Sequence, residues 1–236
     1  MLLSEYGIGG KQMFKTPIFK GSCTAIVTPF GEYGIDYDKM AELIDFQYDN
    51  GTSALVVCGT TGENATMSAY EHEELIEFAC RYNDNRMKII AGVGSNDTQK
   101  ALKFAKCALR CDADGILMVT PYYNKTTQKG LVEHFTYVAD RVDLPMIVYN
   151  VPSRTSIGVK LGTYIELAEH PNINGVKEAS GDFSLFAMTR AACGDNLFIW
   201  SGNDDNTVPM MELGALGVIS VASNIVPGAV TKLCAL

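Results

Sequence analysis

Two hydrophobic patterns alternate along the chain. Short, continuously apolar runs are separated by longer stretches in which apolar residues recur every three or four positions. The short runs are typical of parallel strands buried on both faces, and the longer stretches are typical of amphipathic helices. The runs predict eight strands, at residues 23–28, 54–58, 89–93, 116–120, 146–150, 175–178, 198–202 and 218–222.

Helical spacing fills the intervals between these strands. Ser68 with Glu71 three residues later forms a capping-box pattern. Ala101, Ala105 and Ala108 share one helical face. The apolar stripe of the first predicted helix consists of Met40, Leu43, Ile44 and Tyr48. The predicted helices are residues 36–51, 68–80, 98–110, 129–142, 162–169, 182–192 and 206–213.

A strand followed by a helix, repeated along eight strands, predicts parallel βαβ units. Eight such units close into a (β/α)8 barrel, a fold of typically ~250 residues. An open doubly wound sheet is the alternative, but its phosphate-binding glycine pattern is missing because Asp97 occupies the third glycine position after Gly92 and Gly94. We expect a partly disordered N-terminal extension at residues 1–17, with Met13 a candidate first residue, and one barrel domain at 18–236.

Composition narrows the functional class. Of 236 residues, 47% are hydrophobic and 19% charged, which excludes a disordered or collagen-like chain. The net charge of −8 disfavours nucleic acid and anionic membrane surfaces as partners. The seven cysteines lack paired zinc spacing, and the N-terminus lacks a secretory pattern. We therefore expect a cytoplasmic protein without a bound metal.

Active sites of (β/α)8 barrels lie at the C-terminal ends of the strands, so the residues that end each apolar run are the candidates. The second run ends in Gly59-Thr60-Thr61-Gly62, where a glycine turn exposes backbone N–H groups suited to a carboxylate or phosphate. An ordinary glycine turn is the alternative interpretation. The fourth run ends near Tyr122 and Tyr123, and these aromatic hydroxyls either act in the site or only pack at the barrel mouth.

The fifth and sixth runs carry the strongest candidates. Tyr149 ends the fifth run, and Arg154 follows a proline-stiffened turn from which it can bind a carboxylate or form a surface salt bridge. Lys177 lies within the sixth run, where burial lowers the pKa of an amine and makes it a nucleophile toward carbonyls. Lys88 precedes its strand, so we expect it at the opposite end of the barrel in a salt bridge. The pair Asp204-Asp205 is predicted to cap the next helix.

Four motifs occur in order at the ends of predicted strands: GTTGE at 59–63, TPYYN at 120–124, YNVPSRT at 149–155 and GVKEASGD at 175–182. From about Ile18 onward the chain resembles the dihydrodipicolinate synthase family, a branch of the pyruvate-dependent class I lyases. The resemblance implies a (β/α)8 homo-oligomer, dimeric or tetrameric, that condenses pyruvate with aspartate 4-semialdehyde in lysine and diaminopimelate biosynthesis without a cofactor. The related N-acetylneuraminate lyases are not expected to carry an arginine where Arg154 stands.

The resemblance also implies roles for individual residues. Lys177 forms the imine with pyruvate, and Tyr149 donates and accepts protons in a hydroxyl relay with Thr60 and with Tyr123 of a neighbouring subunit. Thr61 binds the pyruvate carboxylate. The other substrate-binding positions are Arg154, for the carboxylate of the semialdehyde, and the main chain at Gly202 and Ile219.

Feedback by lysine is the last implied property. His72, Asn96 and Tyr122 match an allosteric lysine site, but Lys100 stands where lysine-sensitive members have an acidic residue. An ammonium there repels the ligand, so we expect weak or absent inhibition. The chain stops at Leu236, and we expect a barrel cut short in or before its last helix that lacks the family's C-terminal helical segment. The alternative functions are an N-acetylneuraminate lyase-like or other pyruvate aldolase, and an inactive truncated barrel that serves only as a binding or structural protein.

Overall fold

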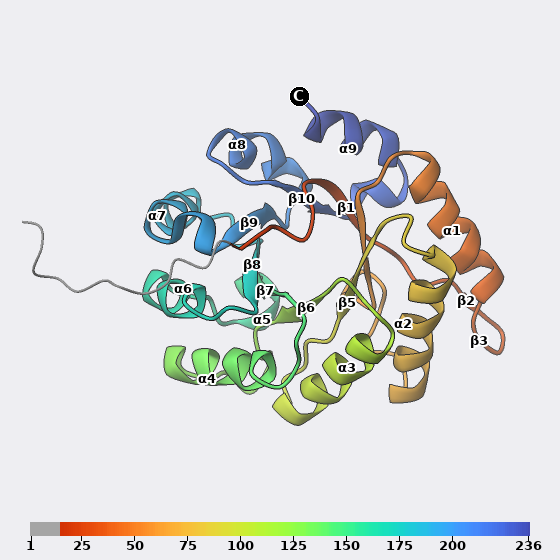
Figure 1. Cartoon of the computed structure of the whole chain (residues 1–236), viewed down its shortest axis with the longest axis horizontal. Coiled ribbons are helices and arrows are strands. Elements are labelled where there is room, and N and C mark those ends of the chain that lie inside the picture. Colours follow the sequence, from red (N-terminus) through yellow and green to blue (C-terminus); the bar gives the residue numbers. More distant parts are fainter. Residues whose placement is uncertain (1–14) are drawn as a thin grey trace, which may run out of the picture.

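The computed structural model describes residues 15–236. Its centre is a closed barrel of eight parallel strands with helices around it (Figure 1). The strands are β1 (Gly21–Ala25), β4 (Ala54–Val57), β5 (Lys88–Gly92), β6 (Gly115–Val119), β7 (Met146–Asn150), β8 (Ile173–Glu178), β9 (Phe198–Ser201) and β10 (Gly217–Ser220). The predicted (β/α)8 barrel is confirmed, and each of the eight predicted strands is present within three residues of its predicted bounds.

One main helix follows each strand. These helices are α1 (Tyr37–Asp49), α2 (Ala69–Asn83), α3 (Thr98–Arg110), α4 (Gln128–Ala139), α6 (Leu161–Ala168), α7 (Phe183–Cys193), α8 (Thr207–Glu212) and α9 (Pro227–Cys234). The capping box of α2 is formed as predicted, with Ser68 and Glu71 bonded reciprocally. The short helix α5 (Pro152–Thr155) and the hairpin of β2 (Phe30–Gly31) and β3 (Gly34–Ile35) were not predicted, since each is too short to show a period.

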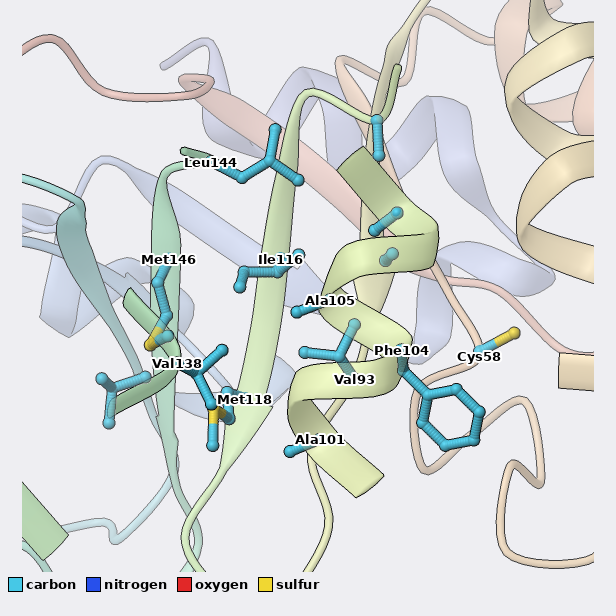
Figure 2. Close-up of a cluster of buried hydrophobic side chains, with 14 of the residues drawn as sticks. Cys58, Val93, Ala101, Phe104, Ala105, Ile116, Met118, Val138, Leu144 and Met146 are labelled. Carbon is cyan, nitrogen blue, oxygen red and sulfur yellow. The ribbon is translucent and has the colours of Figure 1, made fainter. Parts of the chain in front are cut away.

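The hydrophobic core has two layers, one inside the barrel and one between the barrel and its helices. In the outer layer, Ala101 and Ala105 of α3 face Ile116 of β6, while the Phe104 ring points to the opposite side of α3, toward Cys58 (Figure 2). Alanines let α3 approach β6 closely, which explains why small residues occupy this face. The prediction of the apolar stripe of α1 was wrong at its C-terminal end, because Tyr48 is exposed and the neighbouring Gln47 is buried.

Strand β8 contains a β-bulge that decides which of its residues face the barrel interior. Met146 of β7 pairs with Ile173, but the next residue, Ile147, pairs with Gly175, so Asn174 has no register partner on β7. Ile173 packs in the outer core layer. Beyond the bulge, side chains alternate between the two sides of the strand, and Lys177 faces inward.

The N-terminal end of the barrel is plugged. The ring of Phe19, which precedes β1, stacks on the fully buried Trp200 with centroids 4.9 Å apart. Gly175 leaves room for the indole, because a Cβ there would lie 2.6 Å from a Trp200 ring carbon. Lys15 donates to the carbonyls of three residues across this end, Ala168, Ile173 and Asn196. The chain from Lys15 is thus tied to the barrel, while most of the predicted extension, residues 1–14, lies outside the described residues.

Two expectations about side chains at the surface are settled by contacts. Lys88 pairs with Asp114 at 2.6 Å on the N-terminal side of the barrel, as predicted. Asp204 does not cap α8, which was the prediction. Its carboxylate instead accepts hydrogen bonds from the backbone after β10, at Val221 and Ala222, and from the Ser220 hydroxyl.

All seven cysteines are free thiols. Among residues 15–236 there is no helix with the length and hydropathy that a membrane span requires.

Candidate active site

A cavity of about 650 Å³ opens at the C-terminal ends of the strands. This is the end where (β/α)8 barrels hold their active sites. The side chains that line it carry hydroxyl, amine, guanidinium and carboxylate groups above an apolar floor. The lining residues whose side chains carry these groups and could bind or react with a substrate are Thr60, Thr61, Tyr149, Arg154, Lys177 and Asp204.

Lys177 lines this cavity and is only 4% exposed. Its Nζ lies 4.3 Å from the centroid of the Tyr149 ring, which belongs to the neighbouring strand and is its register partner. Burial lowers the pKa of Lys177 to about 8, because the charged amine loses its hydration. At pH 7 roughly one molecule in ten then holds the free amine, far more than for an exposed lysine.

Nearby groups adjust this pKa in both directions. Burial raises the pKa of the Cys23 thiol, which is therefore neutral at pH 7 and adds no charge beside Lys177. The Asp204 carboxylate raises the pKa of Lys177, and the Arg154 guanidinium lowers it. The amine thus sits between one anion and one cation, and burial decides the direction of the net shift.

Gly202 keeps the space beside Lys177 open. A Cβ at this position would lie 2.7 Å from the Cβ of Ala179 and 3.1 Å from the Cγ of Lys177. The Gly202 N–H donates to the carbonyl of Glu178, and the residue lines the cavity. Any larger residue would push the lysine stem out of its present position.

The loop after β4 presents backbone donors to the same cavity. Gly62 and Glu63 donate their N–H groups to the carbonyls of Gly59 and Thr60, which closes the turn. Within residues 15–236, the N–H groups of Thr60 and Thr61 have no hydrogen-bond acceptor. Two adjacent free N–H groups beside a lysine form a site suited to a carboxylate.

Arg154 reaches the cavity from α5, which is anchored from below. The Thr120 hydroxyl, at the end of β6, donates to the Thr155 hydroxyl at 3.0 Å, and both residues are buried. Pro152 begins the helix and fixes its first backbone angle. The guanidinium is thereby held at the rim, where it is exposed enough to meet an incoming anion.

Two predicted site residues are placed apart from the cavity. Tyr123 is 90% exposed, with a left-handed backbone φ of 72°, and does not line the cavity of its own chain. Ile219 is fully buried in the barrel interior, and Val221 lines the cavity from the same segment. Asp204, by contrast, lines the cavity although we predicted only a capping role for it, because a carboxylate next to a turn offers no signal that distinguishes the two.

The three residues matched to a lysine site lie away from this cavity. His72 is 2% exposed, stacks on Phe104, and its Nε2 contacts the Gly92 carbonyl at 2.8 Å. Burial lowers the pKa of His72 to about 4, so the ring is neutral at pH 7. Asn96 accepts a hydrogen bond through its backbone carbonyl, and Tyr122 is partly exposed at the surface.

The motifs around the cavity recur in known proteins. A profile of the dihydrodipicolinate synthetase family matches residues 18–236, nearly all of the described chain. The chain belongs to this family.

Members of the dihydrodipicolinate synthetase family are similar in both sequence and structure. The 4-hydroxy-tetrahydrodipicolinate synthase of Thermoanaerobacter sp. (strain X514) is 50% identical over 218 residues, which cover 92% of this chain and 73% of the relative. The crystal structure of dihydrodipicolinate synthase from Aquifex aeolicus superposes with a TM-score of 0.91 at 46% identity, covering 92% of this chain and 74% of that one.

A third relative was solved with a small molecule. The dihydrodipicolinate synthase of Acinetobacter baumannii, described as chloride inhibited and complexed with pyruvate, has a TM-score of 0.89 at 42% identity, and the match covers 92% of this chain and 75% of that one. The chain thus spans about three quarters of the length of these relatives. The family is settled by sequence and fold together.

Proposed function

We propose that this chain condenses pyruvate with aspartate 4-semialdehyde to give 4-hydroxy-tetrahydrodipicolinate, through an imine on Lys177. The observation that carries the proposal is a buried amine of lowered pKa in a polar cavity, beside a tyrosine and an arginine. Family membership and the relatives' names support the same reaction, a step of lysine and diaminopimelate biosynthesis. The pyruvate complex of the Acinetobacter baumannii relative supports the first substrate.

The first step is capture of pyruvate. Its carboxylate binds the free N–H groups of Thr60 and Thr61, with the Thr61 hydroxyl as a further donor. This places the ketone carbon against the Nζ of Lys177, beside the open space at Gly202. The main chain near Ile219 completes the wall of this subsite. The amine adds to the ketone, and loss of water leaves the imine.

Proton transfers then follow through weak hydroxyl acids. Tyr149 lies against the amine and is the group placed to protonate the departing hydroxyl and to accept protons again. Burial raises the pKa of Tyr149, so the phenol remains protonated and able to donate at neutral pH. Thr60 lines the cavity as the next hydroxyl of the relay. Tyr123 of a neighbouring copy supplies the third hydroxyl in this proposal.

Carbon–carbon bond formation uses the enamine. Loss of a methyl proton from the imine gives the enamine, whose terminal carbon attacks the aldehyde carbon of the semialdehyde, and the aldehyde oxygen takes a proton to become a hydroxyl. Arg154 holds the carboxylate of this second substrate in a charge-assisted contact. The amino group of the product then attacks the imine carbon, closes the ring and releases the amine of Lys177. The imine is the electron sink, so the proposal calls for no resident cofactor.

The exposed Tyr123 is the reason to include an oligomer in the proposal. A residue that is 90% exposed completes a site only when a neighbouring copy covers it. We infer a homo-oligomer, dimeric or tetrameric, in which one chain delivers Tyr123 toward the cavity of another. We also infer a cytoplasmic setting, because seven free thiols suit a reducing compartment.

Borohydride reduction in the presence of pyruvate tests the proposal. We expect a stable pyruvate adduct that peptide mapping places on Lys177, and turnover with aspartate 4-semialdehyde but not with N-acetylmannosamine. An adduct with turnover only on the sugar aldehyde would assign the chain to a sialic acid lyase activity instead. Absence of any adduct would indicate a binding protein without the lyase reaction.

A further inference from the structure

A second pair of polar residues lies directly behind Tyr149 and Lys177. Asn150 and Glu178 follow these residues on β7 and β8, and they are register partners as well. Side chains alternate along a strand, so this second pair points away from the cavity, toward α6. Both residues are buried, Glu178 to 4% exposure.

Every oxygen of the Glu178 carboxylate is hydrogen-bonded. The Asn150 amide donates to both oxygens at 3.1 and 3.0 Å, the Tyr164 hydroxyl donates to one at 2.7 Å, and the Ser180 N–H donates to the other at 2.7 Å. The side-chain oxygen Oδ1 of Asn150 in turn accepts from the Val159 N–H at 3.1 Å. One carboxylate therefore joins β7, β8, α6 and the loop after β8.

Burying the Glu178 carboxylate costs more desolvation free energy than burying an apolar side chain would. Among the ion pairs of residues 15–236, none includes Glu178, so hydrogen bonds alone compensate its desolvation. Burial and the nearby carboxylate raise the pKa of Tyr164 well above its ordinary value, which keeps its hydroxyl a donor. A buried charged group adds little net stability compared with well-packed apolar residues of equal volume, so a role beyond stability is indicated.

We propose that Glu178, Asn150 and Tyr164 form a positioning clamp that holds the ends of β7 and β8 so that Lys177 stays buried against the Tyr149 ring. None of the three lines the cavity, so they act through the residues beside them. The catalytic consequence of the clamp rests on the proposed function, but its geometric consequence does not. A loosened β8 end lets the lysine amine reach water, and the amine becomes harder to deprotonate.

Tyr164→Phe is the variant that weakens the clamp most gently, because it removes one hydroxyl and keeps the ring. Tyr37→Phe is the matched control, since the Tyr37 hydroxyl also donates to a glutamate, Glu74, but does so between α1 and α2. Glu178→Gln is a second variant that keeps the side-chain shape and places an amide group among three donor groups, those of Asn150, Tyr164 and Ser180. Circular dichroism and thermal melts establish that each variant is folded at the assay temperature.

The main measurement is the pH dependence of Lys177 acetylation by trace acetic anhydride, quantified by peptide mass spectrometry. Acetylation needs the free amine, so in the parent chain it rises with pH through a midpoint near 8. We expect Tyr164→Phe and Glu178→Gln to move this midpoint up by about one pH unit, which is about a tenfold loss of free amine at pH 7. We expect kcat to fall by a similar factor with KM for the semialdehyde little changed, and Tyr37→Phe to match the parent.

The outcomes separate the clamp from the proposed function. An unchanged acetylation midpoint in both folded clamp variants overturns the clamp. Failure of both variants to fold also overturns it, because the network would then serve the fold and not the position of Lys177. Acetylation that shifts as expected in a protein that forms no pyruvate adduct supports the clamp and refutes the proposed reaction.

Discussion

The two ends of the barrel each hold a lysine in a protein-lined environment, and only one of these lysines faces a cavity suited to chemistry. Burial lowers the pKa of Lys15 to about 8 and that of Lys177 to the same value. At the N-terminal end, the amine of Lys15 donates to three carbonyls at 2.7–2.8 Å. At the C-terminal end, the amine of Lys177 has the face of an aromatic ring and a cavity of about 650 Å³.

This difference shows that a lowered pKa does not by itself identify a nucleophile. Three acceptors around Lys15 hold all three ammonium protons, so losing one costs a hydrogen bond. Lys177 has fewer such acceptors and lies beside free backbone N–H groups that suit a substrate carboxylate. Access, geometry and a partner for the substrate distinguish the two amines, and the pKa direction does not.

Replacing the lysines one at a time gives the largest expected effect. We expect Lys177→Ala to abolish the pyruvate adduct and turnover completely, because no other lysine lines the cavity of the described chain. Lys15→Met and Lys88→Ala should retain both. The check is borohydride trapping followed by peptide mapping, and an adduct on Lys15 or Lys88 in the parent chain would contradict the assignment.

A substitution at the plugged N-terminal end of the barrel should lower the stability of the protein and leave its activity unchanged. Phe19→Ala removes a buried ring that stacks on Trp200. We expect the free energy of unfolding to fall by about 3 kcal/mol, in the range typical of such truncations, with kcat of the folded fraction unchanged. Urea unfolding measures the first quantity. A large loss of kcat at full folding would show that the two ends are not independent.

A substitution at the C-terminal end of the barrel, where the cavity opens, should change the KM of one substrate more than that of the other. Arg154→Ala removes a charge-assisted hydrogen bond worth about 1.5–3 kcal/mol, so KM for aspartate 4-semialdehyde should rise by roughly 10- to 150-fold. The KM for pyruvate should change far less, because its carboxylate binds near Thr60 and Thr61. Steady-state kinetics with each substrate varied in turn provides the check. Equal changes in both KM values would remove the role assigned to Arg154.

The smallest effect is expected outside both ends. Lys100 is exposed on α3, and His72 is buried with its Nε2 already in contact with a carbonyl. We therefore expect calorimetry with free lysine to detect no tight binding, since the ligand ammonium meets a like charge and lacks an exposed histidine partner. Micromolar binding that disappears in Tyr122→Ala would contradict this expectation.

The barrel could be predicted from the chain because its signals are local and repeated. Each strand is a continuous apolar run, and α2 begins at a capping box that the spacing of Ser68 and Glu71 predicts. The buried face of α1 was harder to predict, because Gln47 lies on it and accepts hydrogen bonds from the Thr24 and Thr52 hydroxyls that only the folded chain brings together. A buried polar side chain of this kind does not show in the hydrophobic periodicity of the sequence.

Placement in the cavity could be predicted where strand ends coincide with unusual residues, as at Lys177 and Arg154. It could not be predicted where placement depends on contacts distant in sequence. Asp204 reaches the backbone after β10, 17 and 18 residues further along the chain, and thereby gains a place in the cavity. Tyr123 remains a prediction, because the residue that it would meet belongs to another copy.

The single extra residue in β8 has a consequence for how tolerant this strand is to change. The bulge absorbs Asn174, so Ile173 and Gly175 keep the sides of their register partners Met146 and Ile147. Loss of Asn174 alone would leave a regular strand in which Lys177 still pairs with Tyr149 and faces the barrel. Loss of one residue between Gly175 and Lys177 would instead turn Lys177 toward the helices and Glu178 into the barrel. The start of β8 thus tolerates a change in residue count that the stretch before Lys177 does not.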